Sequence, residues 1–328
     1  MEASVSLFAT APAVALRELR DLASQFVGLD SHVYGDERYH RVLALMHAMC
    51  AGILECEAAG VARAQIVDAL QDVRAIHARS PFVKRLQEWP RGYPGDFETV
   101  EYICNAINRA PVGTLAHTCE SYALTRSVAQ QHRNKIQHQS AQILRAMLLK
   151  PGRSRVLSIA CGSCADVQRI LPFIQNVVGE LYLNDADPSA LDYSRSILAP
   201  IAHACRFLQG NALRVAKRLE REATFDLVVA GGLFDYLPAK HATYLIETIY
   251  HRLLSPDGSL FFTNIASGNP YRPLIEYFGD WFLIERTDDD IRDYCRVAAI
   301  PTENVKIARD ETGLAHLIEV TRRETSNH

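Results

Sequence analysis

The segment VLSIACGSCADVQRIL carries a run of small residues where an apolar stretch gives way to a helical pattern. Small residues let the backbone approach a ligand closely, and the amides that begin the following helix point toward it. Asp185 follows the next apolar stretch, roughly 20 residues later, where a carboxylate can accept hydrogen bonds from ribose hydroxyls. The alternative role for Asp185 is a helix N-cap, with Asp187 and Ser189 nearby. These features predict a site for a ligand that contains a ribose.

Two further loops carry residues that suit the same kind of ligand. Asn211, next to Ala212, follows the third apolar stretch, and its side chain or backbone can hydrogen-bond the edge of an adenine. Gly231 and Gly232 follow the fourth stretch and leave space against a ligand, and Phe234 can offer apolar surface. Any one of these loops is an ordinary turn, but four of them in order predict one shared site.

The segments around these loops predict the fold of the second half of the chain. Apolar runs at 155–160, 180–185, 205–211, 225–232 and 258–266 alternate with helical patterns at 164–174, 188–201, 212–219 and 237–254. A helix capped by Thr287, two apolar runs at 305–310 and 316–323, and a turn at 311–313 follow. The pattern predicts an α/β class, with a doubly wound, mostly parallel seven-stranded sheet and a C-terminal antiparallel hairpin.

The first half of the chain has a helical pattern throughout. Helices are expected at 16–29, 37–60 and 62–80, and then, after a break that reaches residue 97, at 97–111 and from about 118 to 149. No alternation typical of strands appears. We therefore expect an all-helical domain at 1–149 and a Rossmann-like domain at 150–328. A plain packing or dimerisation bundle is the alternative role for the helical half.

The stretch from about 154 to 322 resembles class I S-adenosylmethionine (SAM) dependent methyltransferases. VLSIACGSC is similar to their first motif, LNDADP to the acidic second, GNA to the third and FDLVVAGGLFDYL to the fourth. The resemblance implies that SAM is the co-substrate or substrate. It implies a cofactor site formed by Ala160, Cys161, Gly162, Ser163, Asp166, Asp185, Asn211, Ala212, Gly231 and Gly232.

The first motif departs from the family pattern at three positions. Ser158 replaces the usual acid, and Ala160 and Cys164 replace glycines, so that only Gly162 remains of the three. The SAM ammonium therefore lacks one carboxylate partner. Asp166, in the first turn of the following helix, is the nearest replacement in the sequence. Its alternative role is a favourable interaction with the helix dipole.

A narrower resemblance reaches into the helical half. WPRGYPGDFETVEYI and NPYRPLIEYFGDWFLIERT are similar to blocks in a bacterial subgroup with a helical N-terminal cap, which implies a cap and substrate domain. That subgroup resembles hydroxy fatty acid methyl ester synthases and azetidine-2-carboxylate synthases. Residues 93–96 predict a type II turn in which Asp96 caps the next helix. Tyr93, with Trp89 nearby, is a candidate catalytic residue because an aromatic face attracts a sulfonium. Further pocket candidates are Tyr122, Arg126 and Asn134.

Three functions remain open at this level. In the first, an oxygen or nitrogen of a small acceptor molecule attacks the SAM methyl group, as part of secondary metabolism. The candidate bases for this reaction are Asp235, Tyr236, His241 and Glu276. Capping, solvation and core packing explain these four residues comparably. In the second, the SAM amine attacks its own γ-carbon, which yields azetidine-2-carboxylate and methylthioadenosine, and Ser158 favours this reaction by weakening stabilisation of the ammonium. In the third, the chain is an inactive SAM-binding interaction protein.

Composition excludes several other classes. The formal charge of -3, with 22% charged and 48% hydrophobic residues, supplies no broad positive field, so we expect no nucleic-acid and no membrane partner. Residues 7–16 are too short to span a bilayer and lack a preceding basic segment, so we expect no signal peptide and a cytoplasmic location. Eight scattered cysteines are typical of reduced thiols, and the CxxC at Cys161 and Cys164 has no partner cluster for a metal. A homodimer is possible.

Overall fold

The computed structural model describes residues 11–29 and 35–323, and these form two compact units. The helical unit contains the described residues up to Ala129 together with Pro270–Phe282, and the sheet unit contains Gln130–Asn269 and the described residues from Leu283 onward. The boundary expected near residue 150 differs from this division, which falls inside a helix. Part of residues 7–16, for which no signal peptide is expected, lies outside the described residues.

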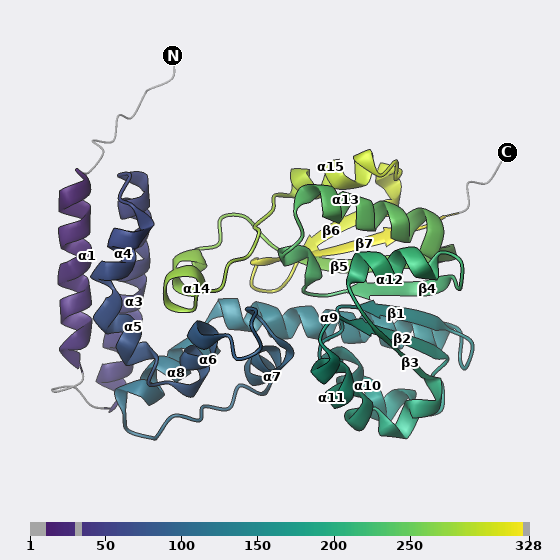
Figure 1. The fold of residues 1–328 in the computed structure, drawn as a ribbon, viewed down its shortest axis with the longest axis horizontal. Helices are drawn as coiled ribbons and strands as arrows, with labels where there is room; N and C mark the ends of the chain where they lie inside the picture. Colours follow the sequence, from purple (N-terminus) through teal and green to yellow (C-terminus); the bar gives the residue numbers. More distant parts are fainter. Residues whose placement is uncertain (1–10, 30–34, 324–328) are drawn as a thin grey trace, which may run out of the picture. The chain divides into compact units, whose positions relative to one another are not determined.

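The sheet unit has seven strands in the order β3-β2-β1-β4-β5-β7-β6 (Figure 1). All neighbouring pairs are parallel except those of β7, which runs antiparallel to β5 and to β6. This arrangement confirms the predicted α/β class with a doubly wound, mostly parallel seven-stranded sheet. The strands are β1 (Arg155–Ile159), β2 (Glu180–Asp185), β3 (Cys205–Gln209), β4 (Phe225–Ala230), β5 (Leu254–Ile265), β6 (Val305–Arg309) and β7 (Ala315–Thr321).

Helices cover both faces of this sheet, which is why its strands are apolar on both sides. On one face, α9 and α10 pack on residues such as Val156 and Leu227. On the other face, α12, α13 and α15 pack on residues such as Leu157 and Val228 (Figure 1). The helices are α9 (Ser127–Leu149), α10 (Ala165–Ile174), α11 (Pro188–Ile197), α12 (Ala212–Leu219), α13 (Ala239–Thr248) and α15 (Asp288–Val297), with the short turns η1 (Ala199–Ala204), η2 (Leu233–Asp235), η3 (Ile249–Leu253) and η4 (Thr302–Asn304).

Local side-chain bonds fix the end of the sheet as the sequence predicts. Thr287 caps α15, because its hydroxyl accepts a hydrogen bond from the Asp290 amide at 3.1 Å. The β6–β7 turn contains Gly313 with φ of 76°, a left-handed conformation that glycine adopts without strain. The Asp310 carboxylate closes this turn by accepting a bond from the Ala315 amide at 2.9 Å. The predicted hairpin is therefore confirmed.

The helical unit differs from the expected pattern at four places. The helix expected at 62–80 is divided at Leu70, and the helix expected at 97–111 ends at Asn105, because Ala106 takes a left-handed conformation. The break before residue 97 contains a helix, α6, because the Ser80 hydroxyl caps it and Pro81 suits its first position. The long helix expected from 118 to 149 is two helices, because Arg126 takes an extended conformation with ψ of 157°. The helices of this unit, apart from the start of α9, are α1 (Pro12–Val27), α3 (Gly35–Ala58), α4 (Arg63–Ala69), α5 (Gln71–His77), α6 (Pro81–Glu88), α7 (Phe97–Asn105), α8 (Leu115–Thr125) and α14 (Arg272–Phe278).

Ion pairs attach α14, which comes late in the chain, to the earlier helices of the helical unit. Arg272 pairs with Glu57 of α3, and Tyr277 donates a hydrogen bond to the same carboxylate at 2.7 Å. Arg74 of α5 pairs with Asp280 at 2.7 Å. The Arg272 guanidinium lowers the pKa of Glu57 below its ordinary value, so this carboxylate stays charged. These contacts explain why Pro270–Phe282 groups with the first part of the chain.

Among the described helices, none combines the length and the apolar character that crossing a membrane requires.

Candidate functional site

The loop after β1 places three residues in the left-handed region of backbone space. Ala160, Gly162 and Cys164 all have positive φ, at 52°, 54° and 55°. Residues with a Cβ adopt this region at a cost of about 1–2 kcal/mol each. Ala160 and Cys164 therefore hold a strained backbone in this loop. Strain of this kind is typical of sites where the backbone path serves a ligand.

Asp185 connects this loop to the end of β2. Its carboxylate accepts a hydrogen bond from the Gly162 amide at 2.8 Å through Oδ2, and another from the Asp187 amide at 2.9 Å through Oδ1. Asp187, not Asp185, caps α11 by accepting from the Ser189 amide. Burial raises the pKa of Asp185 above its ordinary value. Each carboxylate oxygen keeps acceptor capacity for a further donor, such as a ribose hydroxyl.

Asn184, which sequence reasoning missed, holds three loops in place. Its backbone carbonyl accepts from the Cys161 amide at 2.9 Å. Its side-chain amide donates to the carbonyls of Leu208 at 2.8 Å and Gly210 at 2.9 Å, and the residue is buried. The loops after β1, β2 and β3 are therefore bonded to one another. A polar residue inside an otherwise apolar strand was the signal that could have revealed it.

Asp166 lies in the first turn of α10 and is buried. Burial raises the pKa of its carboxyl to about 6. No cation among the described residues pairs with it, and the Val167 amide donates to its Oδ1 at 2.8 Å. Ser163, also buried, precedes it, and the Ser163 carbonyl accepts from the Gln168 side chain at 2.7 Å. A carboxyl group in such a position is well placed to gain from a cationic ligand.

Asn211 caps α12, and its Oδ1 accepts from the amides of Leu213 and Arg214 at 3.1 and 3.4 Å. The side-chain carbonyl is thus used for the cap, and only the amide nitrogen remains for a ligand. Ala212 is the first residue of α12. The role of both residues toward adenine stays a prediction.

Gly231 and Gly232 follow β4 and differ in their surroundings. A Cβ at Gly231 would lie 2.4 Å from Oε1 of Gln139, a residue of α9, so that glycine is needed for close packing. A Cβ at Gly232 would meet nothing within 4 Å. Space for a ligand at this strand end therefore exists beside Gly232, and Gln139 lies next to it.

Asp235, expected as a base, is held in a buried ion pair. Its Oδ2 lies 2.7 Å from Nζ of Lys135, and the two side chains are 2% and 3% exposed. Its Oδ1 accepts a hydrogen bond from the Ile265 amide at 2.6 Å. Both oxygens are therefore engaged within the sheet unit. Tyr236, the neighbouring candidate, is 39% exposed at the end of η2.

The buried polar side of α9 belongs to the sheet unit, whereas the sequence analysis expected this helix to be part of the helical domain. Besides Lys135, it presents Asn134, which donates to Asp310 at 2.9 Å, and Ser140, which donates to the Asp166 carbonyl at 2.8 Å. These contacts place α9 along the loops that follow the parallel strands. Gln131, Lys135 and Gln139, four residues apart, line this face and are buried, although their sequence pattern is that of an ordinary solvated helix face.

The predicted turn before α7 is confirmed in the helical unit. Asp96 caps α7 through the Thr99 amide at 3.0 Å, and Gly95 has φ of 69°, as a type II turn requires. Arg85 pairs with Asp96 at 2.6 Å. Tyr93 is 38% exposed beside this turn. Its role toward a sulfonium stays a prediction.

The two remaining candidate bases lie on different helices. Glu276 is on α14 and pairs with Arg272 at 3.1 Å and Arg63 at 3.6 Å within the helical unit. His241 is exposed in the first turn of α13. Glu276 is therefore occupied by two guanidinium groups.

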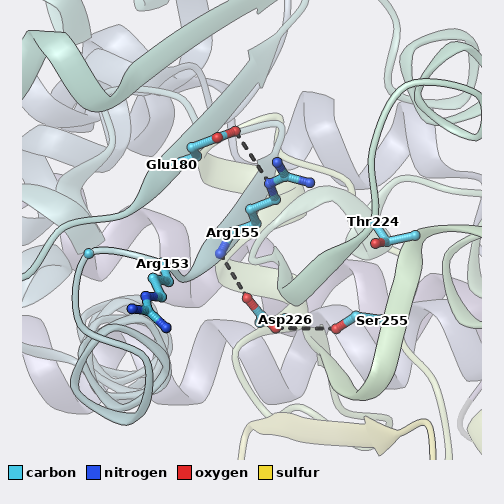
Figure 2. A pocket seen from close by; sticks show the side chains of 7 residues that line it. Arg153, Arg155, Glu180, Thr224, Asp226 and Ser255 are labelled. Atoms are coloured by element: carbon cyan, nitrogen blue, oxygen red, sulfur yellow. Dashed lines mark hydrogen bonds and ion pairs between the residues drawn. The ribbon is translucent and has the colours of Figure 1, made fainter.

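A hollow of about 280 Å³ lies in the sheet unit at the opposite edge of the sheet, where β1, β2 and β4 begin (Figure 2). Most of its charged groups pair with one another. Arg155 pairs with Glu180 at 3.4 Å, and its amide donates to Asp226 at 2.9 Å. Lys150 pairs with Asp226 at 2.6 Å and lowers, with these other donors, the pKa of that carboxyl. Arg153 also lines the hollow and has no ion pair among the described residues.

No family model matches the chain, and no curated protein matches its sequence. Among solved structures it is similar to a possible exported protein from Bordetella parapertussis, with 16% identity, a TM-score of 0.58, and coverage of 96% of this chain and 97% of that one. It also aligns with the pyocyanin biosynthetic protein PhzM, at 16% identity, a TM-score of 0.46 and coverage of 94% and 93%. Magnesium protoporphyrin IX methyltransferase from Synechocystis aligns with 14% identity and a TM-score of 0.43, and the alignment covers 60% of this chain and 88% of that one. At these identities the first similarity shows a shared fold, and the TM-scores of the other two establish nothing further.

Proposed function

We propose that the sheet unit binds SAM at the carboxyl edge of its parallel strands and transfers the methyl group to an oxygen or nitrogen of a small acceptor. The observation that carries the proposal is the left-handed loop at 160–164, bonded through the Gly162 amide to Asp185. A tight loop, a helix N-terminus and an acid after the second strand suit a nucleoside with a charged substituent.

The residues present fit SAM in three respects. Asp185 has acceptor capacity for ribose hydroxyls, and the backbone at Gly232 is open to a ligand on its exposed side. Asp166 offers a buried carboxyl near the loop, where Ser158 leaves the ammonium of the amino acid end without a partner on β1. When bound, SAM supplies a sulfonium whose neighbouring carbons are electrophilic. The chain's own residues then need only to orient it and exclude water.

Lys135 and Asp235 contribute order, not proton transfer, in this proposal. Their buried pair ties α9 to the loop after β4, and Gln139, one turn further along α9, contacts the same loop at Gly231. The pair thereby fixes the wall of the site beside Gly232. The choice of acceptor molecule, and of the atom that is methylated, depends on residues outside this wall.

A second candidate function is cyclisation of SAM by its own amine. The observation that favours it is the engagement of the candidate bases, since Asp235 is paired with Lys135 and Glu276 with two arginines. Intramolecular attack requires no base for an acceptor, only a neutral amine. Ser158 in place of an acid favours the neutral amine.

Incubation of the purified protein with SAM separates these functions. The products are identified by mass spectrometry. We expect S-adenosylhomocysteine only when a panel of small alcohols, phenols, amines and carboxylic acids is added. Methylthioadenosine with a cyclic amino acid, formed without any acceptor, would replace methyl transfer by cyclisation. Tight SAM binding without product under either condition would leave an interaction protein. The Asp185→Ala variant serves as the background control.

A further inference from the structure

We propose that the helical unit contains a binding site for the carboxylate of a small organic acid, formed by Arg126, which directly follows α8, with Tyr122 of α8 and Tyr39 of α3. The site lies wholly within the helical unit. Identification of this acid as the methyl acceptor rests on the proposed function, whereas binding of the acid does not.

Arg126 is held on one side by neutral partners. Its Nη2 donates to the Tyr39 hydroxyl at 2.7 Å and to the Thr125 hydroxyl at 3.2 Å. Its guanidinium carbon lies 5.3 Å from the centre of the Tyr122 ring and 6.0 Å from that of Tyr39. These contacts hold the guanidinium near two aromatic rings, and a positioned guanidinium suits recognition of a planar anion.

The charge of Arg126 has no counterion in the part of the chain that the structure describes. Two other half-buried arginines of this unit do have one, since Arg74 pairs with Asp280 and Arg85 with Asp96. The Nε of Arg126 is buried and meets no hydrogen-bond acceptor. A buried charged donor without an acceptor is costly, and a carboxylate is the planar acceptor that matches a guanidinium.

Tyr122 supplies a second donor without an acceptor. The residue is 1% exposed, and its hydroxyl has no hydrogen-bond partner in the described residues. Burial raises the pKa of Tyr122 above its ordinary value, with a smaller contribution from Cys50 and Tyr271, so the hydroxyl keeps its proton. Arg126 and Tyr122 therefore offer two donors in one place, both of them suited to an anion.

The surroundings of these donors include further aromatic rings. The His47 ring lies edge-on to Tyr122 at 6.3 Å and to Tyr271 at 6.4 Å between centroids. Burial raises the pKa of the nearby Cys50 thiol to about 12, so it is neutral. A lining of this kind favours an acid with an apolar or aromatic body over a sugar or a polyphosphate.

Binding of benzoate, against benzamide as its uncharged counterpart of the same shape, tests the proposal on the full-length protein. We expect saturable benzoate binding by titration calorimetry, with benzamide at least tenfold weaker and inorganic phosphate weaker still. Arg126→Met should weaken benzoate at least tenfold, whereas Arg41→Met, at an exposed arginine of α3 paired with Glu37, should leave it unchanged. Equal affinity for benzoate and benzamide, tighter binding of phosphate, or no saturable benzoate binding would overturn the proposal.

Tyr122→Phe keeps the test decisive if Arg126→Met fails to fold. Because the Tyr122 hydroxyl has no partner, its removal should raise the thermal midpoint of the free protein while weakening benzoate severalfold. A merely structural hydroxyl would give the opposite result, a lower midpoint with unchanged binding, and would contradict the proposal. SAM affinity is measured on the same samples. Benzoate binding without SAM binding would contradict the proposed function alone, and SAM binding without benzoate binding would contradict this site alone.

Discussion

The Gly162 amide donates a hydrogen bond to the Asp185 carboxylate at 2.8 Å, which joins the loop after β1 to the end of β2. Two motifs that lie apart in the sequence therefore act as one structural element. Because the same carboxylate also accepts from the Asp187 amide at 2.9 Å, its position is fixed from both sides. The binding of a ligand to Asp185 therefore depends on the conformation of the left-handed loop.

Replacement of Asp185 by alanine should weaken SAM binding at least tenfold. Loss of hydrogen bonds to a charged group costs about 1.5–3 kcal/mol, and tenfold corresponds to about 1.4 kcal/mol. Asp187→Ala is the matched control, because Asp187 caps α11 and should cost only about 1 kcal/mol of stability. Calorimetric titration with SAM measures both. Equal affinities for the two variants would remove Asp185 from the site.

Replacement of Ala160 by glycine should stabilise the protein. Ala160 has φ of 52°, and glycine relieves the strain of about 1–2 kcal/mol that a Cβ causes there. The greater freedom of glycine in the unfolded chain offsets about 0.4–1 kcal/mol, which leaves a net gain of at most about 1.6 kcal/mol. Ala141→Gly, at an exposed position within α9, should instead lose about 1 kcal/mol. Chemical denaturation of both variants gives the two signs, and a loss in Ala160→Gly contradicts strain at this loop.

Removal of Lys135 should destabilise the protein more than removal of the whole pair. Lys135→Met leaves the Asp235 carboxylate buried without its cation, which typically costs about 3–5 kcal/mol. Adding Asp235→Asn should restore much of this loss, since asparagine can still accept from the Ile265 amide. Denaturation of the two single variants and the double variant measures the coupling. If the double variant regains stability but loses all turnover, Asp235 takes part in the chemistry and the role proposed here is incorrect.

Stability should depend on pH through Asp166. Burial raises its folded pKa to about 6 from an ordinary 3.8, so the folded protein holds the proton more tightly than the unfolded chain. Its contribution is therefore most favourable below pH 4 and declines as pH rises to about 6, by about 3 kcal/mol in all. Asp166→Asn lacks this decline. The difference in free energy of unfolding between variant and wild type should thus shift in favour of the variant between pH 4 and 7.

Asp166 should also make SAM binding depend on pH. As the partner of the ammonium, the carboxyl binds a cation best when ionised, so affinity should increase as pH rises from 5 to 7. Asp166→Asn should remove most of that increase. If both proteins show the same pH profile, Asp166 interacts with its helix alone.

The fold could be predicted from the sequence because each element has a local cause. Strand periodicity, the Thr287 cap and Gly313 each act over a few residues, and each prediction is confirmed. The left-handed conformation of Ala160 and Cys164 could not be predicted from the sequence, because neither alanine nor cysteine has a local preference for positive φ. In that loop the fold imposes a conformation that its residues do not favour.

The wall of the candidate site could not be predicted, because it depends on contacts between distant segments. Lys135 is an ordinary helix residue by sequence, and only its pairing with Asp235, a hundred positions later, distinguishes it. The attachment of α14 to the helical unit similarly rests on Arg272 and Glu57, which no local pattern connects. The same limitation explains why Asp235 was expected to be a free base.

A crystal structure of the protein with S-adenosylhomocysteine tests the central claim most directly. We expect the adenosine part of the ligand at the carboxyl edge of the parallel strands, beside Gly232, with its ribose hydroxyls bonded to Asp185. A nucleoside bound at the opposite edge, in the hollow of Figure 2 near Arg155 and Asp226, would contradict the account. So would crystals grown at saturating ligand in which the carboxyl edge holds no nucleoside.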